Sequence, residues 1–135
     1  MKTAIYKMMV LMVLLAIPAT VLYAQPTGTW FKVPFPFTVG DKAMPAGEYF
    51  VEALYWNAVG FHRSDGKAVL VTIAQSREPR NVTTPKLVFR HYGNVYFLAD
   101  VQFNADSARW IAPGKEEIEL TKAQKRPANL EVTGR

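Results

Sequence analysis

The residues best suited to bind a metal are two histidines, His62 and His91, the only ones in this 135-residue chain. Both fall at the ends of predicted strands beside turns, and either would need acidic ligands such as Asp65 or Asp100 to complete a site. Neither histidine lies in a recognised metal-binding motif, and the spacing of the four is not that of metal ligands. The sequence therefore predicts no metal site and no cofactor.

Nucleophilic catalysis has equally little support in the sequence. The serines are Ser64, Ser76 and Ser107, and none lies in a G-x-S-x-G or S-x-x-K motif. The chain has no cysteine, which excludes thiol catalysis, thiolate metal ligation and disulfides. Because no set of nucleophile, base and orienting group can be named, we predict that the protein is not an enzyme. A hydrolase that uses Asp100, an acid in the most apolar predicted strand, with His62 or His91 stays open as an alternative.

The N-terminus has the organisation of a secretory signal peptide. Lys2 and Lys7 precede an apolar run over residues 8–17, and the small residue Ala24 stands before the expected cleavage point. The run is too short for a bilayer span and is followed by a proline, so we expect no stable membrane anchor after cleavage. The sequence thus predicts a signal peptide over residues 1–24 and a secreted or periplasmic protein.

The charge of the remaining chain limits its partners. The net charge of +5 falls to +3 once Lys2 and Lys7 are removed, well short of the basic footprint of a nucleic-acid-binding protein. Without disulfides, stability must come from apolar burial, for which one small domain of this length suffices. We predict a single β domain over residues 25–126 and a flexible tail over residues 127–135.

Strong period-two patterning begins at residues 33–39 (VPFPFTV), where apolar residues alternate with Pro34, Pro36 and Thr38. This pattern predicts one half-buried strand with its aromatic rings inward. The two prolines remove donors from one side of that strand, which predicts an edge position. Pro45 and Gly47 then predict a corner, rather than a ligand loop, before a second strand over residues 48–54.

Further strands follow at intervals set by turn residues. Residues 68–74 (AVLVTIA) are β-branched and predict a central strand buried on both faces, whereas the polar residues 75–85 predict a surface loop. Residues 95–103 alternate so that one face would carry Val95, Phe97, Ala99, Val101 and Phe103. Acids before bases over residues 115–126 favour a helix, with a strand as the alternative. The remaining strands are predicted over residues 57–63 and 86–91.

These elements predict an all-β fold: a small antiparallel sandwich or partly open barrel of six to seven strands with a short C-terminal helix. No run of residues predicts a second domain.

Two stretches resemble a group of short secreted bacterial proteins, notably from soil acidobacteria. They are VPFPFTVGDKAMPAGEYFVE (residues 33–52) and KLVFRHYGNVYFLADV (residues 86–101), which match the group's F-x-F-x-V-G…P-A-G-x-Y motif and its L-x-F-x-x-Y-G-x-x-Y-F-L hairpin. The resemblance covers about residues 31–104 and departs at Pro36, where the group carries a polar or acidic residue. It implies a bacterial source and a β-rich domain. Because the group has no established activity, the resemblance implies no catalytic residue.

The function predicted from these observations is a non-enzymatic binding or structural module outside the cytoplasm. Its partner would be an envelope protein or a glycan, contacted through surface aromatic residues, since these are too numerous for one inward face. The alternative is a carrier of a small apolar ligand inside a β-barrel. The predicted binding residues are Phe50, Tyr55, Trp56 and Tyr96, with Trp30 as a further surface aromatic.

Overall fold

The structure, a computed structural model, describes residues 3–4, 28–55, 57–66, 69–78, 84–104, 107–123 and 125–135. Trp56 lies outside these residues, and so does the predicted signal peptide apart from residues 3–4. The strands are β1 (Gly28–Val33), β2 (Phe37–Val39), β3 (Lys42–Met44), β4 (Gly47–Leu54), β5 (Ala58–Arg63), β6 (Val69–Ile73), β7 (Gln75–Arg77), β8 (Lys86–Tyr92), β9 (Val95–Asn104), β10 (Ser107–Trp110) and β11 (Ala128–Thr133), with helix α2 (Lys115–Lys122) between β10 and β11.

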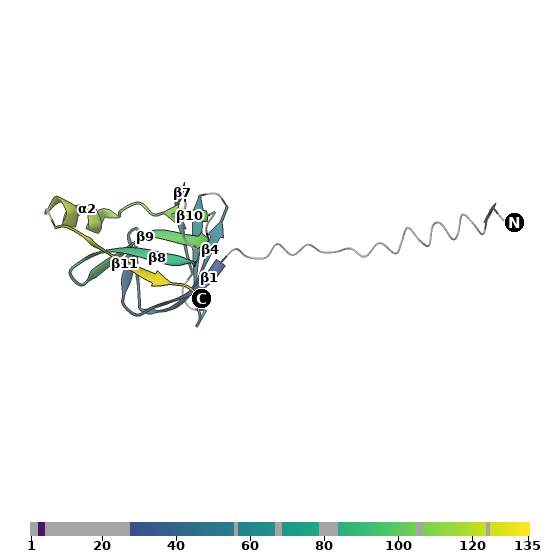
Figure 1. Cartoon of the computed structure of the whole chain (residues 1–135), viewed down its shortest axis with the longest axis horizontal. Helices are drawn as coiled ribbons and strands as arrows, with labels where there is room; N and C mark the ends of the chain where they lie inside the picture. Colours follow the sequence, from purple (N-terminus) through teal and green to yellow (C-terminus); the bar gives the residue numbers. More distant parts are fainter. Residues whose placement is uncertain are drawn as a thin grey trace.

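The strands form two sheets that face each other (Figure 1). The four-stranded sheet has the order β1-β4-β5-β6, and the seven-stranded sheet has the order β11-β8-β9-β10-β7 with β2 and β3 attached to β9. Only Ala74 separates β6 from β7, so the chain passes directly from one sheet to the other. On the opposite side the Arg135 N–H donates to the Trp30 carbonyl oxygen at 3.1 Å. The architecture is therefore a sandwich whose sides curl towards a partly open barrel.

The fold class is confirmed: the chain is all-β with a short C-terminal helix, and the helix forms where it was favoured over a strand. The strands are more numerous than the six to seven predicted, because several predicted segments are divided. The largest side chains buried between the sheets come from alternate positions, as period two requires. They include Phe31, Phe37, Tyr49, Phe61, Leu87, Phe89 and Val101.

The prolines divide the first predicted strand, so a single strand over residues 33–39 was wrong. β1 ends at Val33 and β2 begins at Phe37, because Pro34 and Pro36 cannot donate to a ladder. The predicted edge position was also wrong, because β2, the strand that lies inside this segment, pairs with both β3 and β9. β1 does lie at the edge of its sheet, but it contains only Val33 of the predicted strand. Phe37 is buried, and the ring of the intervening Phe35 stacks on Tyr96 with centroids 4.0 Å apart.

The segment Pro45–Gly47 is a corner, as predicted, between β3 and β4. The hydroxyl of the buried Tyr49 donates to the Pro45 carbonyl oxygen at 2.5 Å, which ties the corner to the core. Burial raises the pKa of Tyr49, although the nearby Arg63 acts in the opposite direction. The motif therefore has a structural explanation that requires no ligand.

A β-bulge at Ala99 makes the predicted facing of β9 wrong. The β8–β9 register passes from Val88 opposite Asp100 to the next pair, Phe89 opposite Leu98, so Ala99 is the extra residue. Leu98 therefore faces inward beside Phe89, and the neighbouring Phe97 turns to the outer face. A period-two pattern cannot reveal a bulge, since both faces of this strand are apolar.

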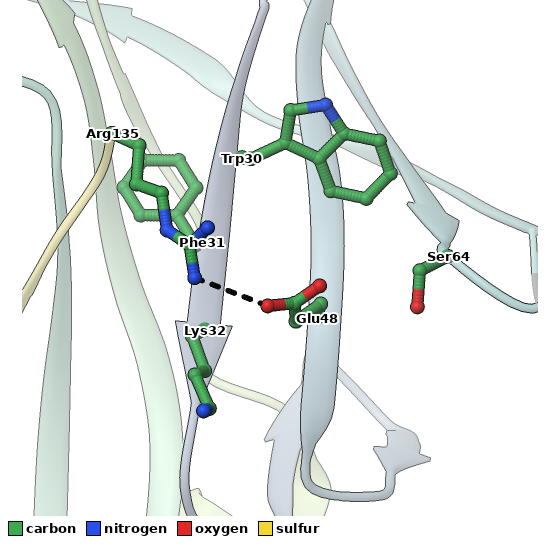
Figure 2. A pocket seen from close by; sticks show the side chains of 6 residues that line it. All are labelled: Trp30, Phe31, Lys32, Glu48, Ser64 and Arg135. Atoms are coloured by element: carbon green, nitrogen blue, oxygen red, sulfur yellow. Dashed lines mark hydrogen bonds and ion pairs between the residues drawn. The ribbon is translucent and has the colours of Figure 1, made fainter.

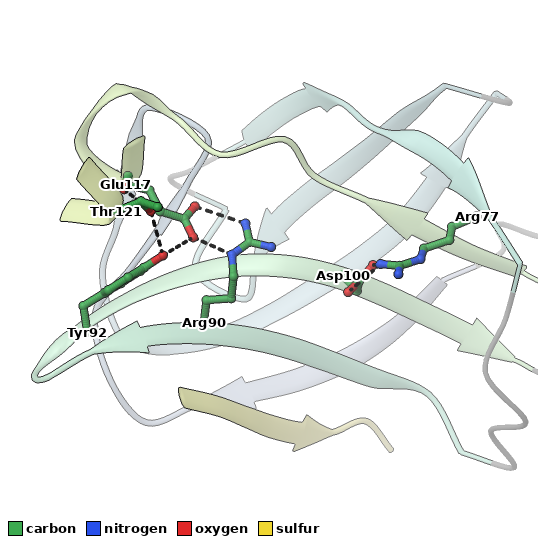
Figure 3. Close-up of polar contacts among 6 residues, drawn as sticks. All are labelled: Arg77, Arg90, Tyr92, Asp100, Glu117 and Thr121. Carbon is green, nitrogen blue, oxygen red and sulfur yellow. Dashed lines mark hydrogen bonds and ion pairs between the residues drawn. The ribbon is translucent and has the colours of Figure 1, made fainter. Parts of the chain in front are cut away.

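Helix α2 covers this part of the outer face of the seven-stranded sheet. Its Glu117, only 2 % exposed, accepts two hydrogen bonds from Arg90, one of them from Nη2 at 3.1 Å, and one from the Tyr92 hydroxyl at 3.3 Å (Figure 3). Burial lowers the pKa of Arg90, and the hydrogen bonds and charge of Glu117 raise it above its ordinary value, so the guanidinium remains charged. Under the helix, the ring of Phe97 is 1 % exposed and meets Tyr92 edge to face.

The start of the helix is held by a distant turn. Asp41 Oδ1 accepts a hydrogen bond from the Lys115 N–H at 2.8 Å, which satisfies one of the free donors of the first turn. The preceding Gly114 makes no side-chain cap, and a Cβ there would lie 2.1 Å from the Gly40 carbonyl oxygen. Only glycine therefore allows this approach.

Three further expectations need correction. Residues 127–135 are not a flexible tail, because β11 pairs along β8 from Ala128 to Thr133. Residues 75–85 are not wholly a loop, since β7 pairs with β10, and residues 79–83 lie outside the described residues. The segment predicted as a central, doubly buried strand is β6, an edge strand of the four-stranded sheet with Val71 and Ile73 exposed.

We predict that Glu117→Ala lowers the free energy of unfolding by about 3–5 kcal/mol, because it leaves the Arg90 charge buried without its partner. Glu119→Ala is the matched control: Glu119 lies on the same helix and is 72 % exposed, so its loss should change stability by no more than about 0.5 kcal/mol. Urea unfolding measures both, and equal effects would contradict the assigned role of Glu117.

Tyr49→Phe should cost about 0.5–1.5 kcal/mol at neutral pH through loss of the hydrogen bond to Pro45. The pKa of folded Tyr49 is raised above its ordinary value of 10.0, so its contribution to stability is present below pH 10 and is lost as the pH rises above it. The stability difference between wild type and Tyr49→Phe should therefore shrink in alkali. Tyr55→Phe, at a side chain 86 % exposed, should show no such change.

Candidate binding face

The outer faces of the two sheets differ in their cover. Helix α2 packs on the seven-stranded sheet, whereas no helix of the described residues packs on the four-stranded sheet. Large apolar side chains are accordingly exposed there: Trp30 is 43 % exposed, Val71 59 % and Ile73 79 %. Trp30 lies at the β1 edge of this face, and Val71 and Ile73 lie at the β6 edge. Exposed apolar side chains on an uncovered sheet face mark candidate interaction surfaces. We call this surface, from β1 to β6, the outer face of the four-stranded sheet.

An aromatic row crosses this face from β1 to β5. The register places Trp30 opposite Phe50, and Phe50 opposite His62. The ring centroids of Trp30 and Phe50 are 5.4 Å apart, and those of Phe50 and His62 are 6.4 Å apart. Since paired residues of antiparallel strands point to the same side, the three rings form one continuous surface.

Two glycines allow neighbouring side chains to lie close against the sheet. Gly28 and Gly60 stand on either side of Glu52 in the register, where their missing side chains leave space. The Phe50 ring occupies the space over Gly28, and the Leu54 side chain occupies that over Gly60. Between the two glycines, Glu52 Oε1 lies 2.6 Å from His62 Nε2, so these two polar side chains are already paired with each other.

A pocket of about 260 Å³ lies at the β1 edge of this face, beside the Trp30 ring (Figure 2). Glu48 receives a hydrogen bond from Arg135 Nη2 at 3.2 Å, and both side chains are substantially exposed. Surface ion pairs of this kind contribute about 0–1 kcal/mol, so a ligand can replace it at low cost. The lining residues are Trp30, Phe31, Lys32, Glu48, Ser64 and Arg135.

Two other hollows offer less. One of about 310 Å³ lies between β7 and β10, but it is more open, and its Arg77 is engaged by Asp100 at 3.2 Å (Figure 3). The other, of about 190 Å³, lies beside β2 and β3 and has no charged residue in its lining. Of these three pockets, the one beside Trp30 is the only one that combines an exposed aromatic ring with several charged groups.

The predicted binding residues do not form one site. Phe50 lies in the aromatic row, and Tyr55 follows β4 with a φ of 53° and a side chain 86 % exposed. Tyr96 belongs to the other sheet, where it stacks between Phe35 and His91. Trp56 lies outside the described residues.

The sequence prediction missed the polar part of the pocket, namely Lys32, Glu48, Ser64 and Arg135. Period-two counting back from Val33 does put Trp30 and Lys32 on the outward side of β1. No sequence pattern indicated that Arg135 would contribute to a site, because residues 127–135 were expected to be flexible.

The structure does not bring the candidate hydrolase residues together. His62 is on the outer face of the four-stranded sheet and Asp100 on that of the seven-stranded sheet, so the core separates them. His91 lies opposite Tyr96, farther along β8 than Val88, the partner of Asp100. The described residues hold no group of three or more metal-ligating side chains, and no described helix is long and apolar enough to cross a bilayer.

Comparison with protein-family models, curated proteins and solved structures finds no significant match. The function is therefore argued from the geometry of this face.

We predict that Phe50→Ala exposes Trp30 further, because it removes the ring that packs beside the indole and covers Gly28. Acrylamide quenching of Trp30 fluorescence, measured with Trp56 and Trp110 replaced by phenylalanine, should increase. Leu130→Ala removes a side chain that is 37 % exposed on the other sheet and should leave the quenching unchanged. Unaltered quenching in Phe50→Ala would disprove the packing role of this ring.

Proposed function

We propose that the protein is a secreted or periplasmic binding module that binds a saccharide at the pocket beside Trp30. The observation that carries the proposal is the exposed indole of Trp30 bordered by Lys32, Glu48 and Ser64. Export is supported by the signal-peptide pattern of residues 1–24.

The chemistry of the lining suits a sugar ring. The electron-rich face of an indole attracts the polarised C–H groups of a pyranose, while hydroxyl groups around the ring require donors and acceptors. Lys32 supplies donors, the Glu48 carboxylate supplies acceptors, and the Ser64 hydroxyl supplies both. A pocket of about 260 Å³ lies just below the roughly 300–1,000 Å³ of drug-sized ligand sites, which favours one ring-sized group over a large ligand.

The support of the Trp30 ring favours binding over a purely structural role. Phe50 packs against the indole and itself lies over Gly28, so the aromatic platform is held before any ligand arrives. A pre-formed site loses less conformational entropy on binding than a flexible one. Trp30 is 43 % exposed, so a large part of its ring contributes nothing to the core and remains available for contact.

The interior gives little support to the alternative of an apolar-ligand carrier. Side chains from both sheets meet between the layers, and Phe31, Phe61 and Phe89 are at most 1 % exposed. Space filled by such rings is not available to a ligand. We likewise propose no hydrolytic reaction for Asp100 or His62. Asp100 is hydrogen-bonded to Arg77, and His62 is hydrogen-bonded to Glu52.

The test is binding to polysaccharides of defined chemistry. The purified protein is mixed with suspensions of peptidoglycan, cellulose and chitin, and the bound fraction is measured at several protein concentrations. We expect binding to at least one, with a loss of affinity of about tenfold or more in Trp30→Ala, because the aromatic anchor is removed. Ile118→Ala is the matched control: Ile118 is also 43 % exposed but lies on helix α2.

Absence of binding to all three polysaccharides, or equal binding by Trp30→Ala and wild type, would overturn the proposal. Circular dichroism of each variant separates a loss of binding from a loss of fold.

A further inference from the structure

The edge of the four-stranded sheet at β6 is unpaired among the described residues. β6 pairs with β5 along its whole length, from Val69 opposite His62 to Ile73 opposite Ala58. It is the last strand in the sheet order β1-β4-β5-β6. Alternate residues of such a strand turn their N–H and C=O groups away from the sheet, where they can pair with a further strand. On the same strand, Val71 is 59 % exposed and Ile73 is 79 % exposed.

The other terminal strands carry features that hinder pairing. β1 has Trp30 C=O occupied by the Arg135 N–H and is followed by Pro34. β7 is only three residues long and ends in a charged Arg77, and β11 presents Glu131 in an ion pair with Lys86. Charges, prolines and short length are the usual protection of an edge strand. β6 (VLVTI) has none of them, since it contains no charge and no proline.

We propose that β6 is a self-association edge, on which β6 of a second copy of this chain adds as an antiparallel strand. A two-fold axis through Val71 pairs all five residues, with Val69 opposite Ile73 of the second copy and Leu70 opposite its Thr72. This arrangement is isologous, so each copy offers the same surface to the other. The two four-stranded sheets would join into one continuous sheet.

A second copy meets no electrostatic penalty at this edge, although the chain as a whole is positively charged. The five residues of β6 are neutral, so no like charges meet at the axis. Val71 of each copy would meet on the outer face, where the exposed valine now contacts water. Burying two such side chains against each other is favourable, and β-branched pairs on neighbouring strands add to it.

This inference concerns a different edge of the sheet from the saccharide pocket. The pocket lies at β1, and β4 and β5 separate β1 from β6. Self-association is therefore independent of the proposed function, and either can fail without the other.

The absence of cysteine in the chain allows a sharp geometric test. In the proposed pair the two copies of residue 71 have Cα atoms about 4.5–5.5 Å apart, which is within disulfide range, whereas the two copies of residue 73 are roughly 14 Å apart along the strands. Under mild oxidation Val71→Cys should form a covalent dimer on a non-reducing gel. Ile73→Cys, the matched control on the same strand and the same face, should stay monomeric.

Solution measurements complete the test. Analytical ultracentrifugation of the wild-type protein should show a monomer–dimer equilibrium, and Val71→Lys should weaken the dimer by about tenfold or more because two charges meet at the axis. Ile118→Lys places the same charge at an exposed apolar position on helix α2 and should leave the dimer unchanged. A monomeric wild type at all concentrations would overturn the proposal and leave this edge to an extended segment of another protein. Equal crosslinking of the two cysteine variants would also overturn it.

Discussion

Burial of a carboxylate requires a compensating charge, and the pairing of Glu117 with Arg90 meets this requirement on one outer face of the molecule. The two side chains come from helix α2 and from β8, so their pairing holds the helix against the seven-stranded sheet. Phe97 and Tyr92 are covered as a result. Among the described residues, α2 is the only α-helix near the C-terminus, and it packs on this side of the molecule only.

The uneven cover explains where the apolar surface remains. The four-stranded sheet carries aromatic and aliphatic side chains on its outward side, as it does on its inward side, but no helix or strand of the described residues packs over them. Glycines at positions 28 and 60 let Phe50 and Leu54 lie against the sheet, which lowers the exposed apolar area without a covering helix. Trp30, Val71 and Ile73 remain outside this arrangement, at the two opposite edges of the sheet.

Much of the fold could be predicted from the sequence, because hydrophobic period and turn residues act locally. The all-β class, the corner at Pro45–Gly47 and the C-terminal helix are examples. The misjudged elements depend on contacts between distant residues. The bulge at Ala99 depends on the helix that covers Phe97. The position of β6 depends on which strands lie beside it, and β11 is a strand because β8 is available to pair with it. For the site, exposed aromatic residues could be listed, but not the pocket, since Arg135 reaches Glu48 across 87 positions of the chain.

The cap that Asp41 provides to helix α2 has a consequence for the order of folding. The capping oxygen and the Lys115 N–H are 74 positions apart, and the local Gly114 offers no substitute. An eight-residue helix is too short to persist alone in water. The helix should therefore form only after the turn between β2 and β3 is in place, so that its docking is a late event in a slow, topologically complex folding reaction.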